Sequence, residues 1–363
     1  MSDRLQQLLS ERPWLLADGA TGTNLFEAGL KTGDAPELWN FEHPDRIEAL
    51  HRSMAEAGSD IVLTNSFGGS RHRLKLHKWE DRVQAVNETA AKICRSVADA
   101  EGARQGRTIM VAGSIGPTGE LFEPLGPLTV AEGTEAFAEQ ARALAAGGVD
   151  VLWIETMSSK DELSAAVAGA ATTGLPIVTT FSFDTNGRTM MGVTPAEAVQ
   201  LFHSLEPRPI AYGANCGVGA AELVATVLNM TGAAEPGDVI VAKGNCGIPY
   251  YVDGRIQYDG TPELMADYAR LARDVGARII GGCCGTSPAH IKAMRAALES
   301  HQPAEERPDL ATVIDRLGQV SIGAEQQFAL LRCGVSPAGE TETGEAGGRR
   351  RGRRRQAGGD PAF

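Results

Sequence analysis

Four cysteines stand beside glycines, a setting that suits a metal site. Cys283 and Cys284 are adjacent within Gly-Gly-Cys-Cys-Gly, whereas Cys216 and Cys246 each follow an asparagine and precede a glycine. Zinc accepts three thiolates at about 2.3 Å and keeps a fourth tetrahedral position open in a catalytic site. Glycines let two adjacent side chains turn to the same side, which regular strand alternation forbids. We therefore predict that Cys216, Cys283 and Cys284 bind one Zn²⁺.

The fourth position of such a site suits a substrate thiol. A free thiol has a pKa of about 8.5 and is only slightly ionised at pH 7, but a thiol that coordinates zinc is deprotonated. The competing interpretation is a buried pair of small residues without a ligand; the glycines around Cys283 and Cys284, together with Cys216, favour the metal site. Cys246 is either a zinc ligand of the resting protein or a spectator thiol, and we favour the spectator. Cys94 and Cys333 have no predicted function, as they lie away from these motifs.

The elements that must position these residues alternate along the chain. Eight short apolar runs rich in branched side chains are typical of buried parallel strands. These runs lie at 14–17, 60–63, 108–111, 149–152, 176–179, 210–212, 239–241 and 277–280. The segments with helical spacing between them lie at 44–57, 81–100, 130–146, 160–171, 195–205, 220–228, 262–275 and 288–298.

Several of these predicted helices carry a start signal. Thr194, Thr261 and Ser287 each place a capping hydroxyl before a proline at the first helical position. Strand–helix alternation repeated eight times predicts an α/β protein with a (β/α)₈ barrel of the TIM type. An open, doubly wound sheet is the alternative fold.

The carboxyl ends of barrel strands form one face, where barrel enzymes carry their active sites. Small, polar and metal-binding residues concentrate after the predicted strands, and four of the six cysteines fall there. These strand-end segments are 18–22, 64–67, 113–116, 155–156, 183–184, 215–217, 243–247 and 281–285. The predicted function therefore lies at this face.

Composition excludes several classes of protein. Hydrophobic residues make up 42% of the 363 residues, and no apolar run approaches the length of a membrane span, so we expect no membrane partner. The first residues are charged and lack the apolar stretch of a secretory signal, which predicts a cytoplasmic protein. Thiols stay reduced in that compartment, so the six cysteines do not predict a disulfide framework.

A basic tract near the carboxyl end departs from the acidic body. Six arginines lie between Arg349 and Arg355 in a protein of net charge −12, so the remainder would carry −18. The tract could contact nucleic-acid phosphates as part of an adaptor, but we favour a disordered solubilising tail. We predict a barrel over 1–302, a short helical extension over 303–333 and a disordered Gly/Arg-rich tail over 334–363.

The strand-end motifs resemble those of the homocysteine S-methyltransferase family. That family includes the homocysteine-binding module of cobalamin-dependent methionine synthase and betaine–homocysteine methyltransferase. The matching motifs are DGATGT at 18–23, TNSF at 64–67, GSIGPTG at 113–119, NC at 215–216 and GGCCGT at 281–286. The resemblance implies a barrel, a zinc ion held by Cys216, Cys283 and Cys284, and the conversion of homocysteine to methionine.

The resemblance also implies roles in substrate binding. Asp18 and Glu155 match acidic positions that receive the amino group of homocysteine. The residues that would receive its carboxylate, mainly through backbone amides, are Gly19, Ala20, Thr21 and, nearby, Ser66. An α-ammonium needs acceptors and a carboxylate suits a glycine-rich turn, so the chemistry agrees. The alternative for Asp18 is a turn-capping residue, and for Glu155 a structural ion pair.

The methyl donor stays open at this point. Betaine enzymes of the family bind a quaternary ammonium between aromatic side chains, yet Phe67 is followed here by two glycines, so one expected aromatic residue is missing. Trp39, Tyr250 and Tyr251 are the substitutes that the sequence offers. The donor is then either betaine or a similar methylated onium, or methylcobalamin on a separate corrinoid protein.

Lys243 offers a second enzymatic interpretation. It ends a predicted strand where relatives usually carry an acidic or a small residue. A buried lysine at a barrel strand end can form a Schiff base with a carbonyl substrate, as in a lyase of the aldolase type. Because that chemistry leaves the cysteines unexplained, we favour the methyltransferase.

Overall fold

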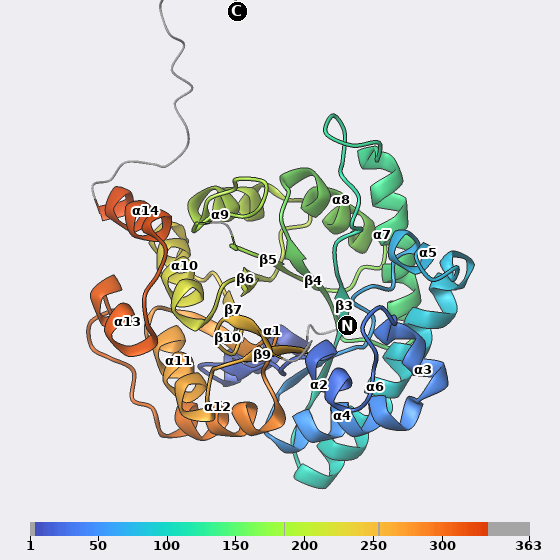
Figure 1. Ribbon diagram of the computed structural model, residues 1–363, viewed down its shortest axis with the longest axis horizontal. Helices are drawn as coiled ribbons and strands as arrows, with labels where there is room; N and C mark the ends of the chain where they lie inside the picture. Colours follow the sequence, from blue (N-terminus) through green and yellow to red (C-terminus); the bar gives the residue numbers. More distant parts are fainter. Residues whose placement is uncertain (1–3, 185, 253–254, 333–363) are drawn as a thin grey trace, which may run out of the picture.

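A closed ring of eight parallel strands forms the centre of the protein (Figure 1). The computed structural model describes residues 4–184, 186–252 and 255–332. The strands are β1 Leu15–Leu16, β2 Ile61–Leu63, β3 Met110–Ile115, β4 Val151–Met157, β5 Ile177–Phe181, β6 Ala211–Cys216, β7 Ile240–Gly244 and β10 Ala277–Gly282. A parallel bridge between Ala17 and Ile61 joins β1 to β2 and closes the ring. The predicted (β/α)₈ barrel is confirmed, and the open sheet is excluded.

Helices follow the strands and cover the outside of the barrel (Figure 1). They are α4 Pro44–Glu56, α6 Val83–Gln105, α7 Val130–Ala146, α8 Lys160–Ala171, α9 Pro195–Ser204, α10 Ala220–Ala233, α11 Pro262–Asp274 and α12 Pro288–Ser300. The hydroxyls of Thr194 and Thr261 cap α9 and α11 as the sequence predicts. Helix α10 runs five residues beyond its predicted end, and Asn229 and Met230 of this extension are buried.

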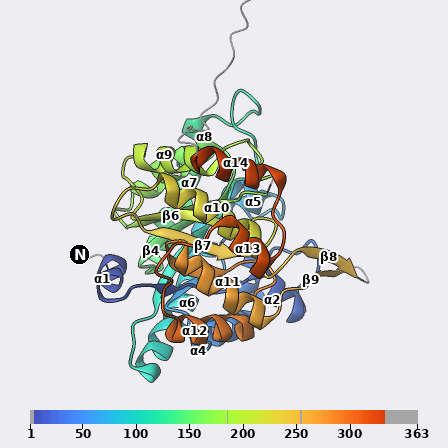
Figure 2. The same ribbon diagram turned by 90° about the vertical axis from the view of Figure 1, so that its left-hand side faces the viewer.

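Two elements lie at the ends of the barrel. Helix α1, Arg4–Glu11, inserts Leu5, Leu8 and Leu9 into the apolar cluster that fills the barrel interior. At the opposite end, β8 Pro249–Val252 and β9 Arg255–Tyr258 form an antiparallel hairpin between β7 and α11. Figure 2 shows α1 and this hairpin on opposite sides of the molecule.

Short helices stand in the loops on the carboxyl side of the first two strands. They are α2 Gly22–Glu27, the 3₁₀ turn η1 Pro36–Leu38, α3 Trp39–Glu42, α5 Arg71–Lys75 and the 3₁₀ turn η2 Glu80–Arg82. Buried Asn65, which follows β2, holds the loop that follows β1, since its side-chain amide donates to Pro36 O at 2.8 Å and its backbone carbonyl accepts from Asn40 at 3.0 Å.

Two helices follow the barrel, α13 Leu310–Leu317 and α14 Ile322–Arg332. They pack on α10, where the hydroxyl of Ser321 donates to Glu222 at 2.6 Å. Among the described residues, no helix is both long and apolar enough to span a bilayer. Cys333 and the predicted tail at 334–363, with its arginine tract, lie outside the described residues.

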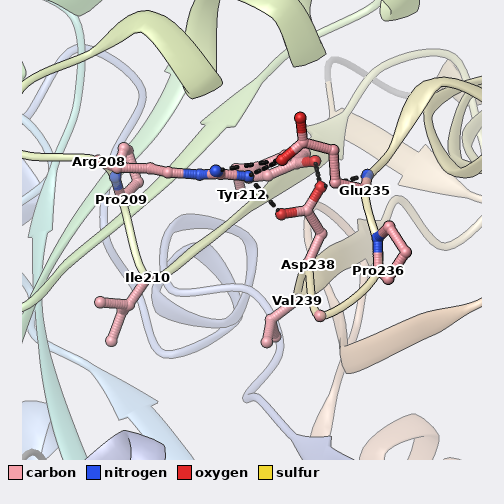
Figure 3. A pocket seen from close by; sticks show the side chains of 9 residues that line it. Arg208, Pro209, Ile210, Tyr212, Glu235, Pro236, Asp238 and Val239 are labelled. Atoms are coloured by element: carbon pink, nitrogen blue, oxygen red, sulfur yellow. Dashed lines mark hydrogen bonds and ion pairs between the residues drawn. The ribbon is translucent and has the colours of Figure 1, made fainter.

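The amino ends of the strands carry two polar networks. In one, Asp60 accepts salt bridges from Arg12 at 2.8 Å, Arg107 at 3.2 Å and Arg295 at 3.1 Å. In the other, at a small hollow between the starts of β6 and β7, Arg208 reaches across to Asp238 (Figure 3). Because the described polar groups of both networks pair with one another at the end of the barrel that governs stability, we interpret both as structural.

Candidate metal and substrate site

The three predicted zinc ligands lie together at the carboxyl end of the barrel. The sulfur atoms of Cys216 and Cys284 are 3.9 Å apart, and all three sulfurs, including that of Cys283, lie within 4.8 Å of one another. Four-coordinate zinc with sulfur ligands at 2.3 Å requires neighbouring sulfurs to lie about 3.8 Å apart. The spacing therefore fits a single tetrahedral ion with one position left for another ligand.

The backbone explains how three sulfurs from two strands converge. Cys216 ends β6 in the left-handed region, with φ of +61°, which turns its side chain away from the strand's regular alternation. Gly282 has no room for a side chain, because a Cβ there would lie 2.2 Å from Thr286 Cγ2. The amide of Cys283 donates to Gly244 O at 2.7 Å, and that of Cys284 donates to Asn245 Oδ1 at 3.0 Å.

Asn215 supports the cluster from β6. Its side-chain amide donates to Thr156 Oγ1 at 2.7 Å and to the sulfur of Cys283 at 3.8 Å. Its carbonyl accepts from the hydroxyl of Thr180 at 2.6 Å, so the side chain is fixed from three sides. Donors that hold a metal ligand fix its orientation and tune its charge. The sequence motif contained Asn215, but its contact with a cysteine on another strand required the fold.

Cys246 is not part of the three-sulfur group. Its sulfur donates to Gly260 O at 3.0 Å and lies 3.2 Å from His290 Nε2. Burial and the charge of Asp259 raise the pKa of this thiol to about 12, so it stays protonated. The geometry agrees with a spectator thiol. Cys94 is fully buried on α6, inside the apolar core.

Two acidic side chains and a lysine lie beneath the sulfurs. Lys243 Nζ is 2.8 Å from Asp18 Oδ1, and Asp18 Oδ2 accepts from the amide of Leu63 at 2.8 Å. Glu155, at the end of β4, accepts a hydrogen bond from the hydroxyl of Ser114 at 2.5 Å. All three ionisable side chains are more than nine-tenths buried. The barrel thus brings the two predicted amino-group acceptors to one place, with a cation between them.

Charges decide the protonation of this group. Burial alone would lower the pKa of Lys243, but the negative charges of Asp18 and Glu155 outweigh it and raise that pKa. Burial raises the pKa of Glu155, and Lys243 opposes the shift. Lys243 is therefore an ammonium held in an ion pair. A Schiff base forms from a neutral amine, so this geometry does not favour the lyase interpretation.

The predicted carboxylate site is partly engaged within the protein. The amide of Ala20 donates to Thr286 O at 3.0 Å, and the hydroxyl of Ser66 donates to Ser114 O at 2.7 Å. Gly19 and Thr21 line the cleft beside the sulfurs. A side chain at Gly19 would collide with Thr286 O at 2.5 Å, which explains the glycine.

A cleft of about 1440 Å³ runs outward from the sulfurs between the hairpin and the loops after β1 and β2. Phe26, Phe67 and Tyr258 contribute aromatic rings to its wall. Among the described residues, Trp39 and Tyr250 are not on that wall, and Trp39 is buried against His43. The side chain of Tyr251 lies outside the description. Sequence reasoning missed Tyr258 because it missed the hairpin that carries it.

The chain is similar to proteins of known family. Residues 15–298 match the sequence profile of the family described as homocysteine S-methyltransferase. The chain is 31% identical over 308 residues to methionine synthase of Mycobacterium tuberculosis and 30% identical to that of Mycobacterium leprae. In both cases 81% of this chain is covered, but only 25% of the relative, so the chain spans about a quarter of their length.

Solved structures give the same result. The homocysteine methyltransferase MmuM from Escherichia coli, in its metallated form, is 25% identical with a TM-score of 0.68. The match covers 80% of this chain and 99% of MmuM. The oxidised form of MmuM is 26% identical, with a TM-score of 0.67. Fold, motifs and family profile agree, and the chain belongs to the homocysteine S-methyltransferase family.

Proposed function

We propose that this protein is a zinc-dependent homocysteine S-methyltransferase that forms methionine. The observation that carries the proposal is the spacing of the sulfurs of Cys216, Cys283 and Cys284, which suits one zinc ion with a vacant position. A zinc ion held there supplies a Lewis acid that lowers the pKa of a substrate thiol. The metallated state of MmuM supports a metal at this site.

The surrounding residues then position the substrate. The acid pair Asp18 and Glu155 lies beneath the sulfurs and offers the negative charge that an α-ammonium needs. Gly19 and Thr21, at the edge of the cleft, face the place where a carboxylate would lie. Asn215 holds Cys283 in place through its amide. A homocysteine molecule bound this way would direct its sulfur toward the open cleft.

For the methyl donor we propose betaine or a similar methylated onium. Glu37, only 5% exposed, lines the outer cleft beside Phe67 and accepts the amide of Gly68 at 2.6 Å. A carboxylate and an aromatic ring together suit an onium cation. In the transfer, the homocysteine sulfur forms a bond to the methyl carbon while the bond from that carbon to the onium nitrogen or sulfur breaks. The electron pair stays with the onium atom, which leaves uncharged, and the thiol proton goes to solvent.

A second donor is favoured by the size of the cleft. Its volume of about 1440 Å³ exceeds what homocysteine and a small onium together require. The methionine synthases that the chain resembles extend over three quarters of their length beyond the matched part. A methylcobalamin carried by a separate corrinoid protein is therefore the alternative donor.

One experiment tests both levels of the proposal. Zinc content is measured, and methionine formation is followed with betaine, with other methylated oniums and with a methylated corrinoid protein. We expect about one zinc per chain, loss of activity on chelation, and recovery when zinc is restored. If methionine forms only with the methylated corrinoid protein, the methyl donor is methylcobalamin and not an onium compound. Trapping of a keto substrate by borohydride on Lys243, in a protein without zinc, would support the lyase instead.

A further inference from the structure

We propose, on the basis of the function above, that Lys243 sets the charge of the substrate pocket. Its ammonium group forms an ion pair with Asp18. Glu155 is then the acid that contacts the single amino group of the substrate. Asp18 and Lys243 then act as positioning residues, and the contact with homocysteine belongs to Glu155.

The hydrogen bonds around Asp18 support this division of roles. Lys243 Nζ lies 2.8 Å from one carboxylate oxygen, and the amide of Leu63 lies 2.8 Å from the other. Both oxygens of Asp18 therefore already accept a donor from the protein. Within the part of the chain that the structure describes, Lys243 and Glu155 line the cleft, whereas Asp18 is not among the lining residues.

Glu155 is placed differently. Among the described residues its one hydrogen bond comes from Ser114 to Oε1, at 2.5 Å, so Oε2 remains for a ligand. It shares the cleft wall with Cys216 and Cys283. A substrate whose thiol reaches the sulfurs can therefore present its ammonium group to Glu155 within the same cavity.

The charge balance of the pocket explains the role of Lys243. Asp18, Glu155 and Lys243 together carry −1 when ionised, which one substrate ammonium neutralises. Two buried carboxylates without the lysine would repel each other, and one would hold a proton. Without Asp18, the lysine would be free to pair with Glu155 and compete with the substrate, because buried charges are stable only when paired. Lys243 also faces the ring of Trp153, 5.6 Å from its centre, which limits its other positions.

The test is a double-mutant cycle on the zinc-loaded protein. Asp18→Asn, Lys243→Met and the double variant are compared for binding of L-methionine and of 4-(methylthio)butanoate, which lacks the amino group, by calorimetry. Asp18→Asn should weaken methionine binding roughly tenfold or more and leave the butanoate little changed. The double variant keeps the −1 charge of Glu155, so methionine binding should return to within about threefold of wild type.

Kinetics supply a second readout. Asp18→Asn should raise KM for homocysteine more than it lowers kcat, and addition of Lys243→Met should reverse that rise. A double variant that folds and holds zinc, but binds methionine as poorly as Asp18→Asn, overturns the proposal, because Asp18 or Lys243 would then touch the substrate. If the double variant with Lys243→Met does not fold, the double variant of Asp18→Asn with Lys243→Gln takes its place. Absence of methionine formation by the wild type with every donor is a separate result that refutes the proposed function itself.

Discussion

The two ends of the barrel hold opposite arrangements of buried charge. At the carboxyl end, the one cation of Lys243 lies with the two carboxylates of Asp18 and Glu155. At the amino end, the one carboxylate of Asp60 lies among three arginines. The first group carries a net −1. The second carries +2 from Asp60 and its arginines, which Glu299, 2.7 Å from Arg295, lowers to +1. Neither group is neutral, but only the group at the carboxyl end has its excess charge beside the cleft.

Exposure explains why the difference matters. Asp60 is fully buried, but the side chains of Arg12, Arg107 and Arg295 are 33%, 14% and 22% exposed, so water screens their excess charge. Lys243 and Asp18 are 2% and 4% exposed, so the excess negative charge there is not screened. A ligand with one ammonium group can neutralise it. The amino end therefore uses charge for stability, whereas under the proposed function the carboxyl end keeps charge for binding.

The largest expected effect is at the carboxyl end. Cys283→Ala removes one of the three proposed zinc ligands and should abolish both zinc retention and methionine formation, while the fold stays intact. Metal analysis and far-UV circular dichroism measure the two outcomes. Cys246→Ala is the matched control, since its sulfur lies outside the cluster, and it should keep zinc. Full activity in Cys283→Ala would end the assignment of this cysteine.

The amino end should respond in the opposite way. Asp60→Asn leaves three guanidinium groups without their shared partner and should destabilise the protein by about 3 kcal/mol. Urea unfolding measures the loss. Zinc content and KM for homocysteine of the folded variant should match wild type, because Asp60 lies at the far end of the barrel. A change in KM would show that the two ends are coupled.

A smaller effect is expected where a side chain supports a metal ligand. Asn215→Ala removes the donor to Cys283 and should weaken zinc affinity or activity by roughly 10–100-fold. Competition with a chromogenic chelator gives the affinity. Thr180→Val is the milder companion, because it removes only a contact to Asn215. Equal effects from both variants would indicate general loosening of the strands instead.

The smallest expected effect is on stability at the carboxyl end. The pKa of Glu155 is raised in the folded protein by burial, so the folded state holds this proton more tightly than the unfolded chain does. The ionised residue therefore costs stability as the pH rises above its ordinary value of 4.5. Glu155→Gln should raise the unfolding midpoint at pH 7, with the gain disappearing below that value, and should weaken homocysteine binding. Thermal unfolding at pH 4 and pH 7 tests the stability, and a midpoint that falls at pH 7 would show that ionised Glu155 stabilises the fold. Unchanged homocysteine binding would contradict the binding role.

Much of the scaffold was predictable because its signals are local. The eight branched apolar runs became the eight barrel strands, and Thr194 and Thr261 cap their helices as expected. The hairpin at β8 and β9 was missed, since its two strands have only four residues each. Helix α1 was missed as well. The apolar side chains of this helix pack into the end of the barrel, so their role becomes visible only once the barrel has formed.

By itself, the sequence determined the order of strands and helices, and so the face on which the cysteine motifs would lie, because parallel strands in a barrel end on one side. Only the tertiary structure decided which groups meet there. Lys243 pairs with Asp18 across 225 positions in the chain, and Cys246 turns from the cluster toward His290 although its motif resembles that of Cys216. Neither outcome follows from local pattern, because the direction of a side chain and the charge beside it are set by strands that meet only after folding.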